Sequence, residues 1–405
     1  MVIGPGGAGV SVTATSGALS RSGTRGPGGA RAVTAPDRDT LLVTVDRCSP
    51  TADLLGVFRQ PDEPVAVSTR LHLLSLDRLA LLERTWTEFT TVLSETMARS
   101  KVALPGVGAV SDIDGAELST LPGVEDFLVM RRIRDEAVSG QWRRIVVDAS
   151  GLGDPFEFLR ASSLLSQALN RLWPRHRRLA AAAERPVMAQ LTAAVDEIDR
   201  DCVDVTELVT DPHTVAMHVV VGADDRGERA LPHLLATVDV MGLALRSVVI
   251  NQGVGAGRED ADHDARMDRL RAVAQGGDPG VEVTELPCLD LPIDRAARLR
   301  KLGVGLPVPN GRPSGSGAAQ VTEAADTGAG TSRVYELTWR QRLPDPDALQ
   351  LGRSGDDLLV TVGGFRHPVR LPSVLRRCVV VDAAWDGTDL TVRFMPDPAL
   401  WPQGR

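Results

Sequence analysis

Gly4-Pro5-Gly6-Gly7-Ala8-Gly9-Val10-Ser11, directly after Met1-Val2-Ile3, is the stretch on which the interpretation of the fold depends. Its glycines have the spacing of a phosphate-binding loop of the form G-x-x-x-x-G-K-[ST]. In such a loop, backbone N–H groups converge on phosphate oxygens, the lysine reaches the outer phosphates and the hydroxyl holds Mg²⁺. The alternative is a glycine-rich segment with no phosphate role. The candidate phosphate-binding residues are Gly4, Gly6, Gly7 and Gly9, with Ser11 as the hydroxyl.

The lysine of this pattern is missing, because Val10 stands in its place. Loss of a charge-assisted contact weakens binding by roughly 1.5–3 kcal/mol. Loss of a group that also neutralises charge on the transferred phosphate lowers the rate by a further factor of about 10²–10³. The sequence therefore predicts a loop that still cradles an anion but turns over ATP poorly or not at all.

Two short apolar runs each end in an aspartate. Residues 40–46 (TLLVTVD) and 145–148 (IVVD) have the composition of buried parallel strands, which would deliver Asp46 and Asp148 to their carboxyl ends. Ligands of α/β folds bind at this edge of the sheet. A carboxylate such as Asp148 would hold Mg²⁺ or its water shell, and the glycine turn 149–154 behind it is suited to sensing a γ-phosphate. One strand ending in aspartate is common, but the glycine loop and both strands in this order favour a nucleotide site.

Composition excludes several classes of function. The chain has 405 residues, which is enough for a large α/β domain and a smaller one. Its net charge of −8 argues against a nucleic-acid-binding surface. No long apolar run or secretion signal is visible, so we expect a soluble, cytoplasmic protein with no membrane span. Scattered cysteines without a C-x-x-C pair argue against zinc, dithiol chemistry and arsenite binding; they are Cys48, Cys202, Cys288 and Cys378.

The rest of the first 305 residues alternates between helical and strand patterns. We expect helices near residues 11–19, 77–100, 117–140, 175–201 and 229–241, and further strands near 71–76, 203–209, 245–251 and 281–286. A loop is expected at 101–116, and a loop with a short helix at 287–302. His213 and His218 do not suggest a metal site, because residues five apart on a helix point about 140° away from each other.

The carboxyl-terminal part has a different character. Residues 305–332 are rich in Gly, Pro, Ser and Ala and are expected to form a flexible linker. Beyond them the apolar period is two, with turn signals at Gly363-Gly364 and Asp386-Gly387. We therefore expect a small all-β sandwich. Its expected strands are 334–339, 357–362, 365–371, 379–382 and 389–394.

The order of these motifs resembles the ArsA-like family, the arsenite-pump and tail-anchored-protein-targeting ATPases of the SIMIBI P-loop class. The resemblance covers roughly residues 1–305 and rests on five segments. Val369 to Leu375 and Asp389 to Phe394 resemble the α-crystallin domain of small heat-shock proteins. The resemblance implies a P-loop NTPase domain at 1–304, the linker at 305–332 and an α-crystallin-like domain at 333–402. The five segments are 4–9, 43–46, 117–125 (ELSTLPGVE), 145–148 and 170–174 (NRLWP).

The resemblance also implies roles for individual residues. Asp46 falls in switch I, where it would help to place the attacking water, and Asp148 is the Walker B acid that holds Mg²⁺ together with Ser11. Gly153 is the switch II glycine. Asn251 would read the adenine edge, although a plain turn cap before Gly253 explains it equally well. The cofactor implied is ATP or ADP with Mg²⁺.

This chain departs from the family pattern at several positions. Pro5 stands where a second lysine is often found, Val12 replaces a threonine, and Gly151-Leu152-Gly153 replaces Pro-Thr-Gly. Three functions follow as hypotheses. The first is a weakly nucleotide-binding or inactive regulatory or scaffold subunit, forming a homodimer or a heterodimer with an ArsA-like paralogue. The second is an active, atypical ATPase that recruits another cation, such as Arg21, Arg25 or Arg31. The third is a chaperone-like binder of hydrophobic protein clients.

Overall fold

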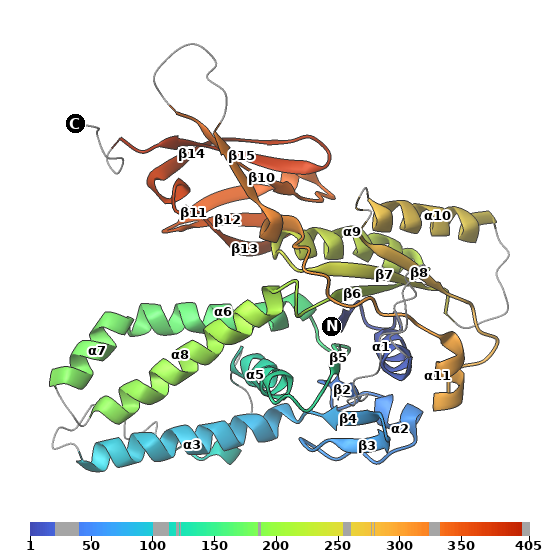
Figure 1. Cartoon of the computed structure of the whole chain (residues 1–405), viewed down its shortest axis with the longest axis horizontal. Helices are drawn as coiled ribbons and strands as arrows, with labels where there is room; N and C mark the ends of the chain where they lie inside the picture. Colours follow the sequence, from blue (N-terminus) through green and yellow to red (C-terminus); the bar gives the residue numbers. More distant parts are fainter. Residues whose placement is uncertain are drawn as a thin grey trace, which may run out of the picture.

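The computed structural model describes residues 1–20, 40–99, 113–118, 121, 123–184, 188–253, 261–276, 278, 280–323 and 333–398. They form a mostly parallel sheet flanked by helices, followed by two smaller antiparallel sheets (Figure 1). The expected fold class is therefore confirmed. Two expectations fall outside the described residues: the recruited arginines at 21, 25 and 31, and most of the loop at 101–116.

The large sheet has the strand order β3-β4-β2-β5-β1-β6-β7-β8. β1 has only two residues, yet it lies in the middle, where Val2 pairs with both Asp148 and His218. Neighbouring strands are parallel except β3 and β4, which are antiparallel. The strands are β1 (Val2–Ile3), β2 (Thr40–Thr44), β3 (Val65–Ser68), β4 (Leu71–Ser75), β5 (Arg144–Asp148), β6 (Met217–Gly222), β7 (Leu245–Asn251) and β8 (Glu282–Leu286).

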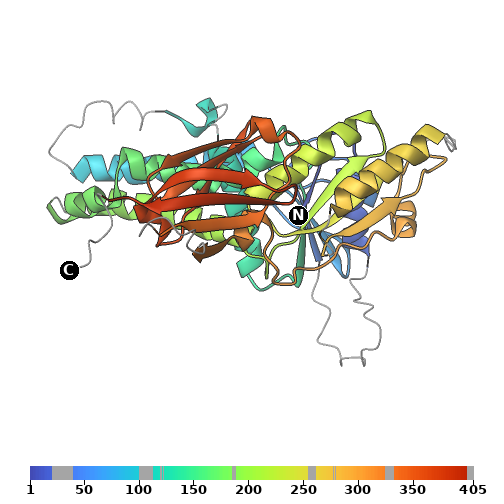
Figure 2. The same cartoon turned by 90° about the horizontal axis from the view of Figure 1, so that it is seen from above.

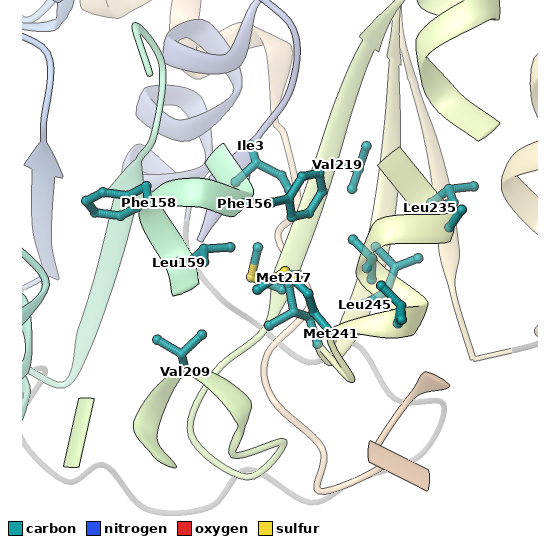
Figure 3. Close-up of a cluster of buried hydrophobic side chains, with 14 of the residues drawn as sticks. Ile3, Phe156, Phe158, Leu159, Val209, Met217, Val219, Leu235, Met241 and Leu245 are labelled. Carbon is teal, nitrogen blue, oxygen red and sulfur yellow. The ribbon is translucent and has the colours of Figure 1, made fainter. Parts of the chain in front are cut away.

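Both faces of this sheet are buried. Side chains alternate along each strand, so Val2 joins one apolar cluster and Ile3 the other. The smaller cluster packs against α1 (Val10–Leu19), α2 (Thr51–Leu55) and α11 (Ala296–Leu302). The larger one packs against α5 (Val124–Val138), α9 (Asp225–Val240) and α10 (Ala261–Gln275), among others. Figure 3 shows part of it, where Phe156 and Met217 lie among aliphatic side chains.

Several helices extend away from the sheet (Figure 1). They are α3 (Arg78–Arg99), α6 (Pro155–Leu172), α7 (Arg175–Glu184) and α8 (Ala189–Thr210). The strand expected at 203–209 is wrong, because these residues belong to α8. Its β-branched residues suggested a strand, but Cys202, Val205 and Val209 are buried at a spacing of three and four, which is the spacing of one helix face. No described helix is both long and apolar enough to cross a membrane.

The carboxyl-terminal residues form two antiparallel sheets, β14-β15-β10-β9 and β11-β12-β13. Residues 320–323 correct the linker expectation, because they form β9 and pair with β10. Residues 324–332 of the expected linker lie outside the described part. β11 was not expected either. The strands are β9 (Gln320–Glu323), β10 (Tyr335–Arg340), β11 (Gln350–Ser354), β12 (Asp357–Val362), β13 (Phe365–Arg370), β14 (Cys378–Trp385) and β15 (Asp389–Pro396), with short 3-10 turns η3 (Gly315–Ala318), η4 (Pro346–Ala348) and η5 (Leu375–Arg377).

The β-sandwich packs on α9 (Figure 2). Gln341 is fully buried and its amide donates to the carbonyl of Ala236 at 2.9 Å. Arg342 donates to the Asp239 carboxylate through its backbone N–H at 2.9 Å and through Nη1 at 2.8 Å. One apolar cluster runs from the parallel sheet into the sandwich, so the two parts share a continuous core.

Candidate functional site

The glycine loop lies between β1 and α1, at the carboxyl ends of the central strands. Gly7 and Gly9 have φ values of +83° and +91°, which side chains rarely adopt, and a Cβ on Gly4 would overlap the carbonyl oxygen of Val220 on β6. Among the described residues, none has an atom within 4 Å of a Cβ placed on Gly6 or Gly7, so this part of the structure leaves the crest of the loop open. The loop therefore uses its glycines for backbone geometry and leaves room for a ligand.

No described side chain caps the amino end of α1. Gly9 is the residue preceding the helix, no side chain caps it, and the first turn contains no acid. The first N–H groups of a helix have no partner within the helix and carry partial positive charge. Together with the open crest, these donors fit a phosphate group without a protein carboxylate competing for them.

Ser150 links Ser11 to Asp148. Ser11 Oγ donates to Ser150 Oγ at 2.8 Å, and the backbone N–H of Ser150 donates to Asp148 Oδ1 at 3.1 Å. On the other side, Thr51 and Ser49 donate to Asp148 Oδ2 at 3.3 and 3.4 Å. Burial raises the pKa of Asp148, and these hydrogen bonds only partly offset the rise. A hydroxyl and a buried carboxylate in this arrangement suit a hard cation such as Mg²⁺.

Asp46 lies against the glycine turn that follows β5. Its carboxylate accepts a hydrogen bond from the backbone N–H of Cys48 at 2.9 Å. Gly151 has φ +74°, and a Cβ there would overlap the Asp46 carboxylate. Gly153, two residues further on, has no atom within 4 Å of its Cβ position. The expected switch I acid and the expected switch II turn are thus neighbours, while Gly153 faces open space.

Asn251 lies at the end of β7 and joins that strand to the loop. Its Nδ2 donates to the carbonyl of Ala8 at 2.9 Å, and the N–H of Gly253 donates to its Oδ1 at 3.0 Å. A Cβ on Gly9 would overlap the Asn251 amide. The amide therefore caps the turn before Gly253, which was one of the two interpretations, and the adenine contact stays a prediction.

The lysine position is occupied by a packed side chain. Val10 is 4% exposed and belongs to the smaller apolar cluster, together with Ala14 and Val220. A cation does contact the loop from outside: Arg226 Nη1, on α9, donates to the carbonyl of Gly6 at 2.8 Å. Sequence analysis missed Arg226, because only the sheet order places the start of α9 beside the loop.

The two histidines considered for a metal site do not share a helix. His213 lies in a turn, and His218 is on β6, where its Nδ1 is 2.8 Å from Ser247 Oγ. The geometric argument used a helix that does not exist here. Across the described ranges, no group of three or more His, Cys, Asp or Glu side chains converges as a metal site.

The first turn of α6 connects this site to the β-sandwich. α6 begins directly after the glycine turn, with Asp154 capping it through a 2.8 Å hydrogen bond from Phe156 N–H. The rings of Phe156 and Phe365 on β13 meet edge to face at 6.0 Å. The Arg160 guanidinium lies 4.7 Å from the centre of the Phe365 ring and donates to the carbonyl of Arg366.

Comparison with known proteins agrees with this architecture. Residues 2–275 match the family described as anion-transporting ATPase, and residues 334–394 match the HSP20-like domain found in ArsA. Protein Rv2184c of Mycobacterium tuberculosis is 31% identical over 389 residues, which cover 89% of this chain and 90% of that protein. Uncharacterized protein SCO2128 of Streptomyces coelicolor is 30% identical over 441 aligned positions, covering 100% and 99%.

A more distant relative bears a functional name. The putative arsenical pump-driving ATPase of Chlorobaculum tepidum is 21% identical over 375 residues, covering 88% of each chain. The family match extends from β1 to α10 and so includes the loop, both aspartates and Asn251. The chain therefore belongs to the anion-transporting ATPase family, the ArsA-like P-loop ATPases, and ends in the HSP20-like domain found in ArsA.

Proposed function

We propose that this protein is a regulatory or scaffold member of its family that binds ATP or ADP with Mg²⁺ weakly and turns ATP over far more slowly than a lysine-bearing loop would. The observation that carries this proposal is the contrast between an open loop and a buried Val10, which is 4% exposed where the pattern has lysine. The loop keeps the shape for phosphate but has lost the charge at that position.

Each residue at the site has an assigned role in this proposal. The backbone N–H groups of Gly4, Gly6, Gly7 and Gly9, together with those at the start of α1, hold the phosphates. Ser11 and Asp148 hold Mg²⁺, which when bound would neutralise charge on the phosphate oxygens. Asp46 accepts a proton from the attacking water or orients it, Gly153 donates its N–H toward the γ-phosphate, and Asn251 reads the adenine edge.

We also propose that the protein works as a dimer, either with a second copy of itself or with an ArsA-like paralogue. Gly6 and Gly7 are exposed at the crest of the loop, where a partner chain would shield the phosphates from water. A paralogue with an intact loop would supply the turnover that this chain lacks. Gel filtration with light scattering, with and without Mg·ATP, measures the mass of each assembly.

Two further functions remain as alternatives. An active, atypical ATPase is favoured by the contact between Asp46 and Gly151, which keeps a candidate water-positioning acid beside the switch-like turn. A chaperone-like binder of hydrophobic protein clients is favoured by the HSP20-like domain. Phosphate release separates the first alternative from the main proposal, and suppression of aggregation by the whole chain tests the second.

The decisive experiment compares the wild type with Val10→Lys and Val10→Met. We expect the wild type to bind Mg·ATP weakly by calorimetry and to release phosphate at a rate near background. Val10→Lys should tighten binding about 10-fold and raise phosphate release by about 10²–10³. Val10→Met, with similar bulk and no charge, should do neither. Rapid phosphate release by the wild type would overturn the proposal in favour of an active ATPase, and failure to bind nucleotide would overturn the assigned site.

A further inference from the structure

Arg226 is the cationic side chain that the described part of the chain places on the glycine loop. Its Nη1 donates to the Gly6 carbonyl at 2.8 Å, at the crest where the loop faces open space. We infer that Arg226 supplies, from α9, the positive charge that the loop lost when its lysine position became Val10. The inference rests on the proposed nucleotide binding and names the residue that makes it possible.

The sheet order explains how a distant residue reaches the loop. β1 pairs directly with β6, so the loop after β1 and the turn after β6 emerge side by side. α9 starts at Asp225, three residues beyond the end of β6. Arg226 therefore extends from the first turn of α9 to the crest of the glycine loop.

The start of α9 is held firmly. Asp224 caps it, accepting from the N–H of Gly227 at 2.7 Å. A Cβ on Gly227 would overlap the carbonyl oxygen of Gly222, so this residue must be glycine for the helix to approach the strand so closely. Because Gly227 directly follows Arg226, the same contact fixes the backbone from which the arginine extends.

The charge of Arg226 is available to a ligand. Nearby acids are taken by other arginines: Asp225 pairs with Arg266, and Glu228 with Arg269 and Arg266. In the described ranges no carboxylate forms an ion pair with Arg226, whose recorded partner is the neutral Gly6 carbonyl. A guanidinium has five N–H donors, so one can hold the loop while the others face phosphate oxygens.

The same helix provides a matched control. Arg229 lies three residues further along, is exposed like Arg226, and lines the same shallow cavity of about 570 Å³ beside His233. Its described contacts do not include the loop. Replacing either arginine by alanine removes one positive charge from one face of α9, so a difference between the two variants reports the contact with the loop.

The experiment measures Mg·ATP affinity by calorimetry for the wild type, Arg226→Ala, Arg226→Lys and Arg229→Ala, each first shown by thermal unfolding to be folded without nucleotide. We expect Arg226→Ala to weaken binding about 10-fold or more, Arg226→Lys to recover part of the loss, and Arg229→Ala to stay within about 2-fold of the wild type. Equal effects of the two alanine variants would overturn the inference while leaving nucleotide binding intact.

A double-mutant cycle with Val10→Lys tests replacement of the lost charge directly. If Arg226 supplies the positive charge of the missing lysine, Arg226→Ala should weaken Mg·ATP binding much less in the Val10→Lys background than in the wild type. An equal loss in both backgrounds would show that Arg226 only shapes the loop, which also overturns the inference. If the wild type binds no nucleotide, the proposed function fails first and the inference fails with it.

Discussion

At the scale of single residues, Asp148 combines burial with a place in the proposed Mg²⁺ site. Its carboxylate is fully buried, and burial raises its pKa, so the ionised form is destabilised in the folded protein at neutral pH. The carboxylate is nevertheless oriented by donors from Ser150, Thr51 and Ser49. A buried carboxylate kept for the proposed Mg²⁺ site would lower the stability of the protein while no cation is bound.

Asp148→Asn should therefore stabilise the nucleotide-free protein while abolishing the Mg²⁺ dependence of nucleotide binding. Because the folded-state pKa is raised, the penalty is present above it and disappears as the pH falls toward the ordinary carboxylate value. We expect a gain of about 1 kcal/mol at pH 7 that shrinks toward pH 4, measured by urea unfolding. Asp225→Asn, an exposed control, should change stability by less than about 0.5 kcal/mol. A loss of stability in Asp148→Asn would mean that the hydroxyl donors outweigh burial.

At the scale of elements, the first turn of α6 is in contact with both the site and the β-sandwich. Phe156 and Arg160 lie only a few residues beyond the glycine turn. The Phe365 ring on β13 lies edge to face with Phe156 and beneath the Arg160 guanidinium. Movement of that turn would therefore weaken or strengthen the contacts that Phe365 on β13 makes with α6, because aromatic and cation–π contacts depend on distance and angle.

Phe365→Ala should loosen the amino end of α6. We expect the free energy of unfolding to fall by about 1–3 kcal/mol, since a partly buried ring and its contacts with Phe156 and Arg160 are lost. Hydrogen exchange of the backbone amides of residues 156–160 should speed up. Phe58→Ala is the matched control, because Phe58 is 95% exposed, and it should leave both quantities unchanged. Unaltered exchange in α6 would argue that the two parts are not coupled there.

How much of these elements could be predicted depended on where their stability comes from. β2, β5 and β7 were found because short apolar, β-branched runs identify buried parallel strands. β9 has the sequence Gln-Val-Thr-Glu and owes its existence to pairing with β10, which no local pattern reveals. Ser11 and Asp148 both hydrogen-bond to Ser150, which belongs to the expected glycine turn, whereas Thr51 and Arg226 come near them only through the order of the strands in the sheet.

At the scale of the whole molecule, a buried ion pair ties the two parts together. Asp239 on α9 is 2% exposed, and Arg342, which follows β10, is its partner at 2.8 Å. Burial raises the pKa of Asp239 despite the opposing effect of Arg342. A buried carboxylate with its partner removed is costly, so this contact is expected to control docking of the β-sandwich.

Arg342→Ala should destabilise the protein by about 3–5 kcal/mol at pH 7.5, because it leaves the Asp239 carboxylate buried and unpaired. The loss should be smaller at pH 5, since a raised pKa lets the acid become neutral as the pH falls. Urea unfolding at the two pH values measures both effects. Arg393→Ala breaks the more exposed Arg393–Glu336 pair in the same sandwich and should lower stability far less than Arg342→Ala does. A loss for Arg342→Ala that is independent of pH would contradict this electrostatic account.

The distant pairing partners of β1 have a consequence for how the protein is made. Val2 and Ile3 pair with residues 148, 218 and 219. The centre of the sheet, between β5 and β6, therefore cannot be completed until the ribosome has released β6. Contacts that join distant parts of a chain form late, and exposed apolar surface invites aggregation meanwhile. During synthesis, we therefore expect the glycine loop after β1 to reach its folded position only after β6 has been made and β1 has paired with it.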